Sequence, residues 1–133
     1  ADGVHVGQSD CSIQQARAIL GKSACIGVSA HNLEEARVAQ QGGADYIGCG
    51  AVFGSATKQD ATPLSRETLR TICQGVSIPV VAIGGITAQN VQQLAGSGIQ
   101  GIAVVSAIFG QPDKTEAARQ MHQLANQVCG GAQ

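Results

Sequence analysis

Short apolar runs alternate with longer segments of helical periodicity along the chain. The runs are rich in aliphatic residues and glycine, which is typical of strands buried on both faces of a parallel sheet. They occupy residues 3–6, 25–28, 46–49, 79–83 and 101–105. A turn and a segment with a helical repeat follow each run. The pattern therefore predicts a series of about five βα units with parallel strands.

Polar residues mark the expected helix starts. Four segments begin with a side chain able to cap the first turn and carry a polar partner three residues later: Ser12 and Gln15, Asn32 and Glu35, Thr87 and Asn90, and Asp113 and Glu116. This spacing is a signal for a helix N-terminus. Glycines at positions 21, 42 and 98 follow the periodic segments and indicate where three of the helices end.

Local pattern alone leaves two folds open, a doubly wound open sheet or part of a closed barrel. In both, the carboxyl ends of parallel strands meet at one edge of the sheet. Polar and glycine residues follow the predicted strands at 7–10, 29–31, 50–58, 84–85 and 106. We expect these stretches to converge on one face, where barrel enzymes carry out their chemistry.

Composition narrows the function classes. The eight Lys and Arg residues are interleaved with nine acidic residues, giving a net charge of -1 and no basic stripe for nucleic acid. No apolar run reaches the roughly 18 residues of a membrane span, so we expect one compact cytoplasmic domain. The five cysteines form no C-x-x-C pair. We expect them to be small buried apolar residues rather than zinc ligands or a redox pair.

Two neighbouring features near the end of the chain predict a phosphate site. Gly84 and Gly85 close one predicted strand, and the next strand runs from Gly101 to Ser106. Glycine lets the backbone approach a ligand closely, and a following helix start offers free N–H groups to an anion. Loops after the last two strands of a barrel often bind phosphate. The alternative is that both glycines serve only a tight turn.

The long connection from 50 to 63 contains Ser55, Ala56, Thr57 and Lys58. Hydroxyl groups donate hydrogen bonds to phosphate oxygens, and a lysine on a flexible stem suits a pyrophosphate. A connection of this length in a compact domain is often a lid. The alternative is a solvated loop with an incidental lysine.

The first two predicted strands end in further candidates. Asp10 is a candidate ligand for Mg²⁺, which takes one or two carboxylates with waters and substrate phosphates; the alternative is a helix-start residue. Ser29 is a candidate hydrogen-bond donor to substrate. His31 lies two residues on and lacks a third orienting group, so triad chemistry is not supported. We expect His31 to bond nearby backbone and His5 to be a hydrogen-bonded core histidine.

Several stretches taken together closely resemble the thiamine-phosphate synthase family, from residue 1 to about residue 110. They cover residues 2–10, 26–31, 43–50, 55–58 and 83–87, and their order and spacing are specific. The resemblance implies a TIM (β/α)8 barrel of the phosphate-binding type. Residues 1–133 are then one domain that forms the C-terminal part of that barrel.

The resemblance also implies a reaction. Members of this family are transferases of thiamine biosynthesis that join 4-amino-2-methyl-5-hydroxymethylpyrimidine diphosphate to thiazole phosphate, giving thiamine phosphate and pyrophosphate with the help of Mg²⁺. By resemblance, Asp10 matches a magnesium ligand, and Ser29 and Lys58 match groups that hold the pyrimidine diphosphate. The thiazole-phosphate site is matched by Ser55, Ala56, Thr57, Gly85, Val105 and Ser106.

Two other functions stay open at this point. A related thiazole tautomerase isomerises the thiazole partner without joining it, although Asp10 and the stretch from Ser55 to Lys58 argue against it. The other is a non-catalytic phosphate-binding part of a barrel.

The chain departs from the family pattern in two ways. Ala51 replaces a common proline, and family members carry about three more βα units before the first strand seen here. We therefore expect a further N-terminal segment, or association with another copy, to complete the barrel, and little activity without it.

Overall fold

The computed structural model describes residues 1–8, 10–53 and 64–129. Five parallel strands form one sheet in the order β1-β2-β3-β4-β5, so neighbours in sequence are also neighbours in space. Their bounds are β1 Gly3–Val6, β2 Cys25–Ala30, β3 Tyr46–Cys49, β4 Val80–Ile83 and β5 Gly101–Ala103. The predicted run of parallel strands is confirmed, because each apolar run forms a strand.

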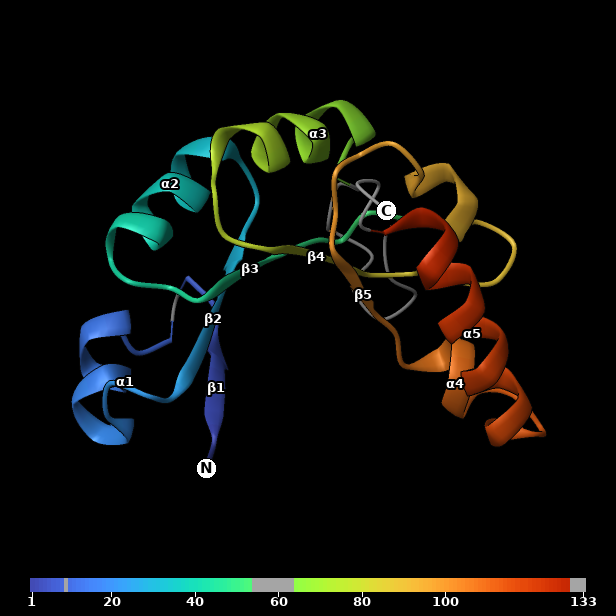
Figure 1. Cartoon of the computed structure of the whole chain (residues 1–133), viewed down its shortest axis with the longest axis horizontal. Coiled ribbons are helices and arrows are strands. Elements are labelled where there is room, and N and C mark those ends of the chain that lie inside the picture. The colour runs from blue at the N-terminus through green and yellow to red at the C-terminus, as the bar shows by residue number, and fades with distance from the viewer. Residues whose placement is uncertain (9, 54–63, 130–133) are drawn as a thin grey trace.

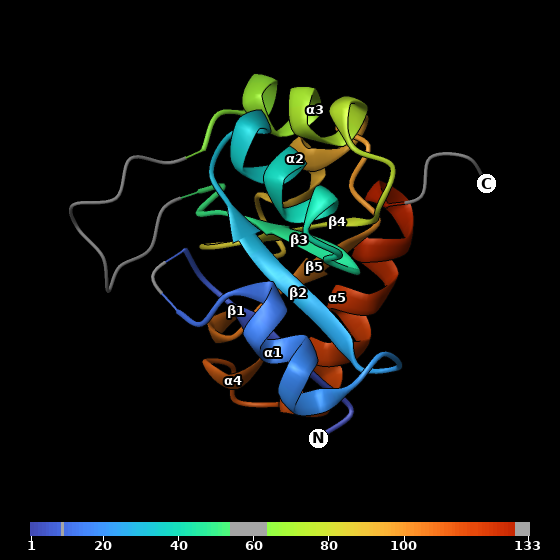
Figure 2. The same ribbon diagram turned by 90° about the vertical axis from the view of Figure 1, so that its left-hand side faces the viewer.

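The helices lie on one side of this sheet. They are α1 Ile13–Leu20, α2 Leu33–Gln41, α3 Arg66–Gly75, the 3-10 helix η1 Val91–Leu94, α4 Ser106–Phe109 and α5 Lys114–Val128. Figure 1 shows the strands as an arc, with α1, α2, α3 and α5 around its outer side. Seen from the β1 side, α1 and α2 lie in front of the first three strands (Figure 2). A curved parallel sheet of consecutive strands with helices outside is a part of a (β/α) barrel, as predicted.

Three of the four predicted helix starts are confirmed. Ser12 Oγ accepts from the Gln15 backbone N–H at 3.1 Å, and Gln15 Oε1 accepts from Ser12 N–H at 3.0 Å, so both halves of a capping box are present. Asn32 caps α2 and Asp113 caps α5 through a single bond each, from the Glu35 N–H at 2.8 Å and from the Glu116 N–H at 3.0 Å. These polar side chains fix where the helices leave the strand ends.

The predicted helix starting at Thr87 is wrong. The Thr87 N–H donates to Asn90 Oδ1 at 2.8 Å, and Asn90 Nδ2 donates to Gly85 O at 2.8 Å, so the asparagine closes a turn. A short 3-10 helix follows. Gly96 and Gly98 come soon after and both have positive φ angles. The local side-chain bonds and this glycine-rich end leave too short a stretch for an α-helix.

Side chains of the strands alternate between the two faces of the sheet. On the outer face, Ile26, Ile47 and Ala82 are completely buried, and they join the core with Leu69 and Ile72 of α3. The inner, concave face is covered by no helix among the described residues (Figure 1). Among the described residues of this face, His5, Cys25 and Ile83 are exposed.

The cysteine prediction holds only in part. Cys49 lies on the outer face and is completely buried, whereas Cys11 and Cys25 are exposed. Cys25 has the same parity along β2 as the concave-face residues, which explains its exposure. Burial against the helices, rather than an apolar neighbourhood in sequence, decides which thiol is hidden.

Candidate functional site at the carboxyl ends of the strands

The five strands point their carboxyl ends at one edge, because every neighbouring pair is parallel. Asp10 follows β1, and Ser29 is the second-last residue of β2. These two predicted residues therefore come from neighbouring strands. Gly85 follows β4 and Ser106 follows β5, again from neighbouring strands. The predicted residues Ser55, Ala56, Thr57 and Lys58 lie outside the described residues.

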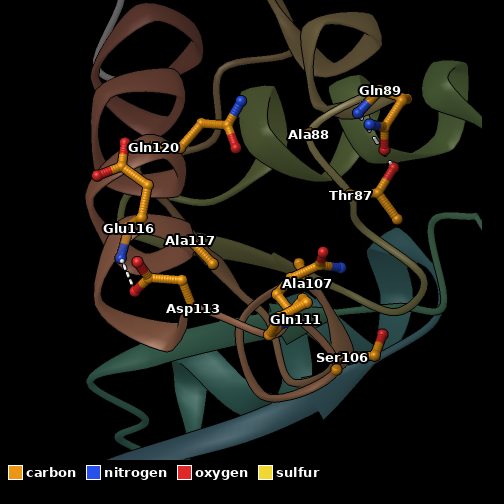
Figure 3. Close-up of a pocket in the computed structure, with 12 residues that line it drawn as sticks. Thr87, Ala88, Gln89, Ser106, Ala107, Gln111, Asp113, Glu116, Ala117 and Gln120 are labelled. Carbon is orange, nitrogen blue, oxygen red and sulfur yellow. Dashed lines mark hydrogen bonds between the residues drawn. The ribbon is translucent and has the colours of Figure 1, made fainter.

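A cavity of ≈ 520 Å³ lies next to the ends of β4 and β5. Figure 3 shows its lining, contributed by the turn after β4, by α4 and by the first turns of α5. Thr87 and Ser106 supply hydroxyl groups, and Gln89 and Gln120 supply amides. Of the three predicted residues at this end, Ser106 lines the cavity and Gly85 and Val105 do not.

Gly84 and Gly85 form the turn beyond β4 in left-handed conformations, with φ angles of 105° and 66°. A Cβ at Gly84 would lie 2.5 Å from the Cβ of Ala51, so no side chain fits there. The Gly84 carbonyl also accepts from the Phe53 N–H at 3.1 Å. The positive φ angles mean that the turn by itself favours glycine at both positions. Gly85 is exposed, so its backbone is accessible to a phosphate.

The short helix α4 begins at Ser106, directly beyond β5. Its first backbone N–H groups have no helical acceptor, as at any helix start. In barrels of this type, the loops after the last two strands and the N-terminus of a short extra helix together bind phosphate. The order β4, glycine turn, β5 and α4 reproduces that arrangement.

Asp10 closes the turn after β1. Its Oδ2 accepts from the Gly7 N–H at 2.7 Å, and its own N–H donates to Gly7 O at 3.3 Å. Because Ser12 caps α1, the helix-start role proposed as an alternative for Asp10 belongs to Ser12 instead. Asp10 is exposed and lines a second cavity, of ≈ 280 Å³, together with Gln8 and Glu35.

The ends of β1 and β2 are tied together by a side chain that the sequence analysis did not single out. Gln8 Nε2 donates to the Ser29 carbonyl at 2.7 Å. This bond fixes the backbone at Ser29, which is half-buried on the concave face. Its only signal in the sequence is a polar residue directly after a strand.

His31 bonds a side chain rather than the nearby backbone that we expected. Its Nδ1 lies 3.0 Å from Glu35 Oε1, and its N–H donates to the same oxygen at 2.8 Å. His31 is exposed. The pair joins the residue before the Asn32 cap to the first turn of α2.

The expectation of a core position for His5 is wrong. His5 is exposed on the concave face of β1, where its ring bonds Tyr46 and Ser29. β1 is an edge strand, and the ring reaches across the concave face to Ser29 on β2 and Tyr46 on β3. Tyr46 was missed by sequence reasoning, since a single tyrosine in an apolar run reads as core. Desolvation raises the pKa of the Tyr46 phenol above 10.0.

Among the described ranges, no group of three or more His, Cys, Asp or Glu side chains is placed to hold a metal ion. None of the helices described is long and apolar enough to cross a membrane.

The curved parallel sheet, the helices on its outer side and the polar carboxyl ends of its strands define part of a (β/α) barrel protein. The family model described as thiamine monophosphate synthase matches residues 1–108. The chain belongs to this family.

Relatives of known name agree with this assignment. The chain is 53% identical over 124 residues to the thiamine-phosphate synthase of Ruminiclostridium cellulolyticum, covering 93% of this chain and 59% of that one. It is 50% identical over 127 residues to the Chloroflexus aurantiacus synthase, covering 95% and 58%. The chain thus spans less than two thirds of these relatives.

Solved structures give the same picture. The thiamine phosphate pyrophosphorylase of Pyrococcus furiosus superposes with a TM-score of 0.87 at 42% identity, over 98% of this chain and 62% of that one. The 3-hexulose-6-phosphate synthase of Salmonella typhimurium superposes with a TM-score of 0.72 at 24% identity, over 96% and 63%. The second likeness shows the fold alone. The names of the closer relatives favour the synthase over the tautomerase.

Proposed function

We propose that this chain works in thiamine biosynthesis as the C-terminal part of a thiamine-phosphate synthase, a cytoplasmic transferase. It would join the pyrimidine diphosphate to thiazole phosphate, with release of pyrophosphate. One observation carries the proposal. Candidate groups for two phosphate-bearing substrates lie at one sheet edge, with Asp10 and Ser29 at one end and Gly85 and Ser106 at the other, in a chain of this family.

The two ends of the edge suit different substrates. Thiazole phosphate would bind at the backbone of Gly85, Val105 and Ser106 and at Ser55 to Thr57. The exposed glycine turn and the start of α4 there favour a phosphate. The pyrimidine diphosphate would bind at Ser29 and Lys58, with Ser29 donating a hydrogen bond from the concave face.

The proposed reaction is dissociative. The bond between the pyrimidine methylene carbon and the diphosphate oxygen breaks first, and both its electrons leave with pyrophosphate. The thiazole nitrogen then attacks the carbon cation. Such a step needs stabilisation of the leaving charge more than a general base. Lys58 and Ser29 would bind the leaving oxygens.

Mg²⁺ fits the residues present. Asp10 binds one backbone N–H through Oδ2, and its Oδ1 has no partner among the described residues. A single exposed carboxylate matches an ion that keeps several waters and shares substrate phosphates. When bound, Mg²⁺ would neutralise charge on the diphosphate. Asp10 would hold it at the end of β1.

Pyrophosphate release from the two substrates with Mg²⁺ tests the proposal. We would compare the 133-residue chain with the same chain fused to the unmatched part of the Ruminiclostridium cellulolyticum synthase. Release by the fusion, with or without release by the chain alone, supports the synthase. Absence of release from both contradicts it.

Lys58→Ala in the active form should lower turnover by about a hundredfold, the scale of losing a preorganised charge donor. Lys22→Ala is the matched control, because Lys22 is an exposed residue just after α1 and should be silent. Similar rates for the two variants would remove Lys58 from the proposed site.

A further inference from the structure

Three side chains from neighbouring strands form a hydrogen-bonded chain on the concave face. The Tyr46 hydroxyl lies 2.9 Å from His5 Nδ1, and His5 Nε2 lies 2.8 Å from Ser29 Oγ. The two rings have centroids 5.6 Å apart and planes tilted by 35°. Ser29 is thereby connected to a phenol that lies on a different strand.

Two glycines make room for this arrangement. His5 pairs with Gly27 on β2, and Gly27 pairs with Tyr46 on β3, so the rings flank a position without a side chain. A Cβ at Gly27 would collide with the Tyr46 ring, and one at Gly48 would lie 2.8 Å from His5 Cε1. The concave face is therefore shaped to hold both rings against the sheet.

The direction of the hydrogen bonds decides what Ser29 can offer a ligand. A neutral imidazole has one donor and one acceptor nitrogen. If Tyr46 donates to Nδ1, then Nε2–H donates to Ser29 Oγ and the serine hydrogen is free. In the opposite order, Nδ1–H donates to the Tyr46 hydroxyl oxygen, and Ser29 donates its hydroxyl hydrogen to Nε2.

Two arguments favour the first order. His5 Nδ1 is the partner that the structure gives the Tyr46 hydroxyl, and desolvation, which raises the pKa of that phenol, keeps its proton available for donation. Diphosphate oxygens are acceptors only, so a serine that recognises them has to donate. The Ser29 backbone is fixed independently by Gln8.

We propose that His5 and Tyr46 are positioning residues that hold the Ser29 hydroxyl as a hydrogen-bond donor to a bound diphosphate. The inference rests on the proposed function for the identity of the ligand. The proton order itself is a property of the free chain. Both residues act through Ser29.

The tautomer of His5 is the first test. In the full chain labelled with ¹⁵N-histidine, NMR should show His5 protonated at Nε2, with His31 and His122 as internal references. Tyr46→Phe removes the donor to Nδ1 and should shift His5 toward the Nδ1–H form. His122→Gln, on the exposed side of α5, should leave it unchanged. A wild-type His5 protonated at Nδ1 overturns the proposed order.

Binding of inorganic pyrophosphate with Mg²⁺, measured by calorimetry, is the second test. Ser29→Ala and Tyr46→Phe should each weaken binding about three- to tenfold, the scale of one hydrogen bond. If Tyr46 acts through Ser29, the double variant should bind no more weakly than Ser29→Ala alone. Additive losses would contradict the coupling.

The two tests separate the possible failures. A chain that binds pyrophosphate but has His5 protonated at Nδ1 contradicts the positioning role and leaves the proposed function standing. If the fusion described above has His5 protonated at Nε2 and does not bind pyrophosphate, the diphosphate is not the ligand of Ser29, and the proposed function at this site is contradicted.

Discussion

Arg17 of α1 and Asp45, just before β3, form an ion pair with Nη2 and Oδ2 3.0 Å apart. The same Oδ2 accepts the Ile26 N–H at 2.8 Å. The Asp45 carboxylate thus joins α1 to the starts of β2 and β3. The pKa of the Asp45 carboxyl is lowered from 3.8, mainly by the hydrogen bond from the Ile26 N–H and next by the hydrogen bond from Arg17.

Asp45→Asn should lower the free energy of unfolding at pH 7 by about 1 kcal/mol, since the pair is partly exposed. A depressed folded pKa gives stability that is present above pH 3.8 and lost as the pH falls through the folded value. The difference from wild type should therefore shrink in acid, as urea unfolding at several pH values would show. Glu116→Gln, which breaks the exposed pair with Arg119, should have almost no effect. Equal losses in both variants would contradict the role of Asp45.

Gly27→Ala should destabilise the protein by about 1–3 kcal/mol, because the added methyl group overlaps the Tyr46 ring. Gly101→Ala is the matched control in the same sheet, since its Cβ would lie an ordinary 3.5 Å from Val81 Cγ2. Chemical denaturation of both variants is the measurement. If Gly27→Ala is as stable as the control, the tyrosine ring does not occupy the concave face as described.

Cys49 should resist alkylation in the native protein. Burial raises its thiol pKa to about 12, so very little thiolate exists at pH 8. Cys11 and Cys25 are exposed and should react first. Mass spectrometry after timed iodoacetamide treatment, with and without urea, measures the order. Native labelling of Cys49 as fast as Cys11 would show that the core opens locally.

Gly85→Ala should weaken binding of thiazole phosphate by at least about tenfold. It forces a side chain into a conformation with φ 66° beside the proposed phosphate. Gly21→Ala controls for backbone cost alone, because Gly21 has φ 96° with nothing within 4 Å and lies at the end of α1. Calorimetric titration distinguishes the two. If Gly85→Ala and Gly21→Ala bind thiazole phosphate equally well, Gly85 serves only to form the turn.

Asp10→Asn should raise the Mg²⁺ concentration needed for half-maximal pyrophosphate release in the active form, since the amide is a weaker ligand for a hard cation. The amide oxygen still accepts the Gly7 N–H, so thermal stability should change little. An unaltered Mg²⁺ titration would exclude Asp10 as the ligand.

The sequence pattern predicted the strands well, because a short aliphatic run between two helical segments is typical of a buried parallel strand. β2 extends to Ala30 rather than 28, and β5 stops at Ala103. The segment after Thr87 was predicted wrongly, since Asn90 bonds back to Gly85 instead of starting a helix. A capping spacing does not reveal which backbone group its side chain will choose.

The candidate site was predictable only where it follows strand ends. Asp10, Ser29 and Ser106 could be placed at one edge from the rule that parallel strands end together. The link between His5, Ser29 and Tyr46 spans separations of 24 and 41 residues. It depends on strand register and on two glycines opposite the rings, and neither can be read from local periodicity.

The alternation along β2 has a consequence for how this protein can change. Ile26 and Val28 face the helices, while Gly27 and Ser29 alternate with them and face the concave side. Substitutions at every second position can alter ligand recognition while the helix packing stays intact. Losing a single residue from this strand would exchange the two sets at once. We therefore expect this strand to tolerate replacement of a concave-face residue, where the space beside Tyr46 permits it, far better than insertion or deletion of one residue.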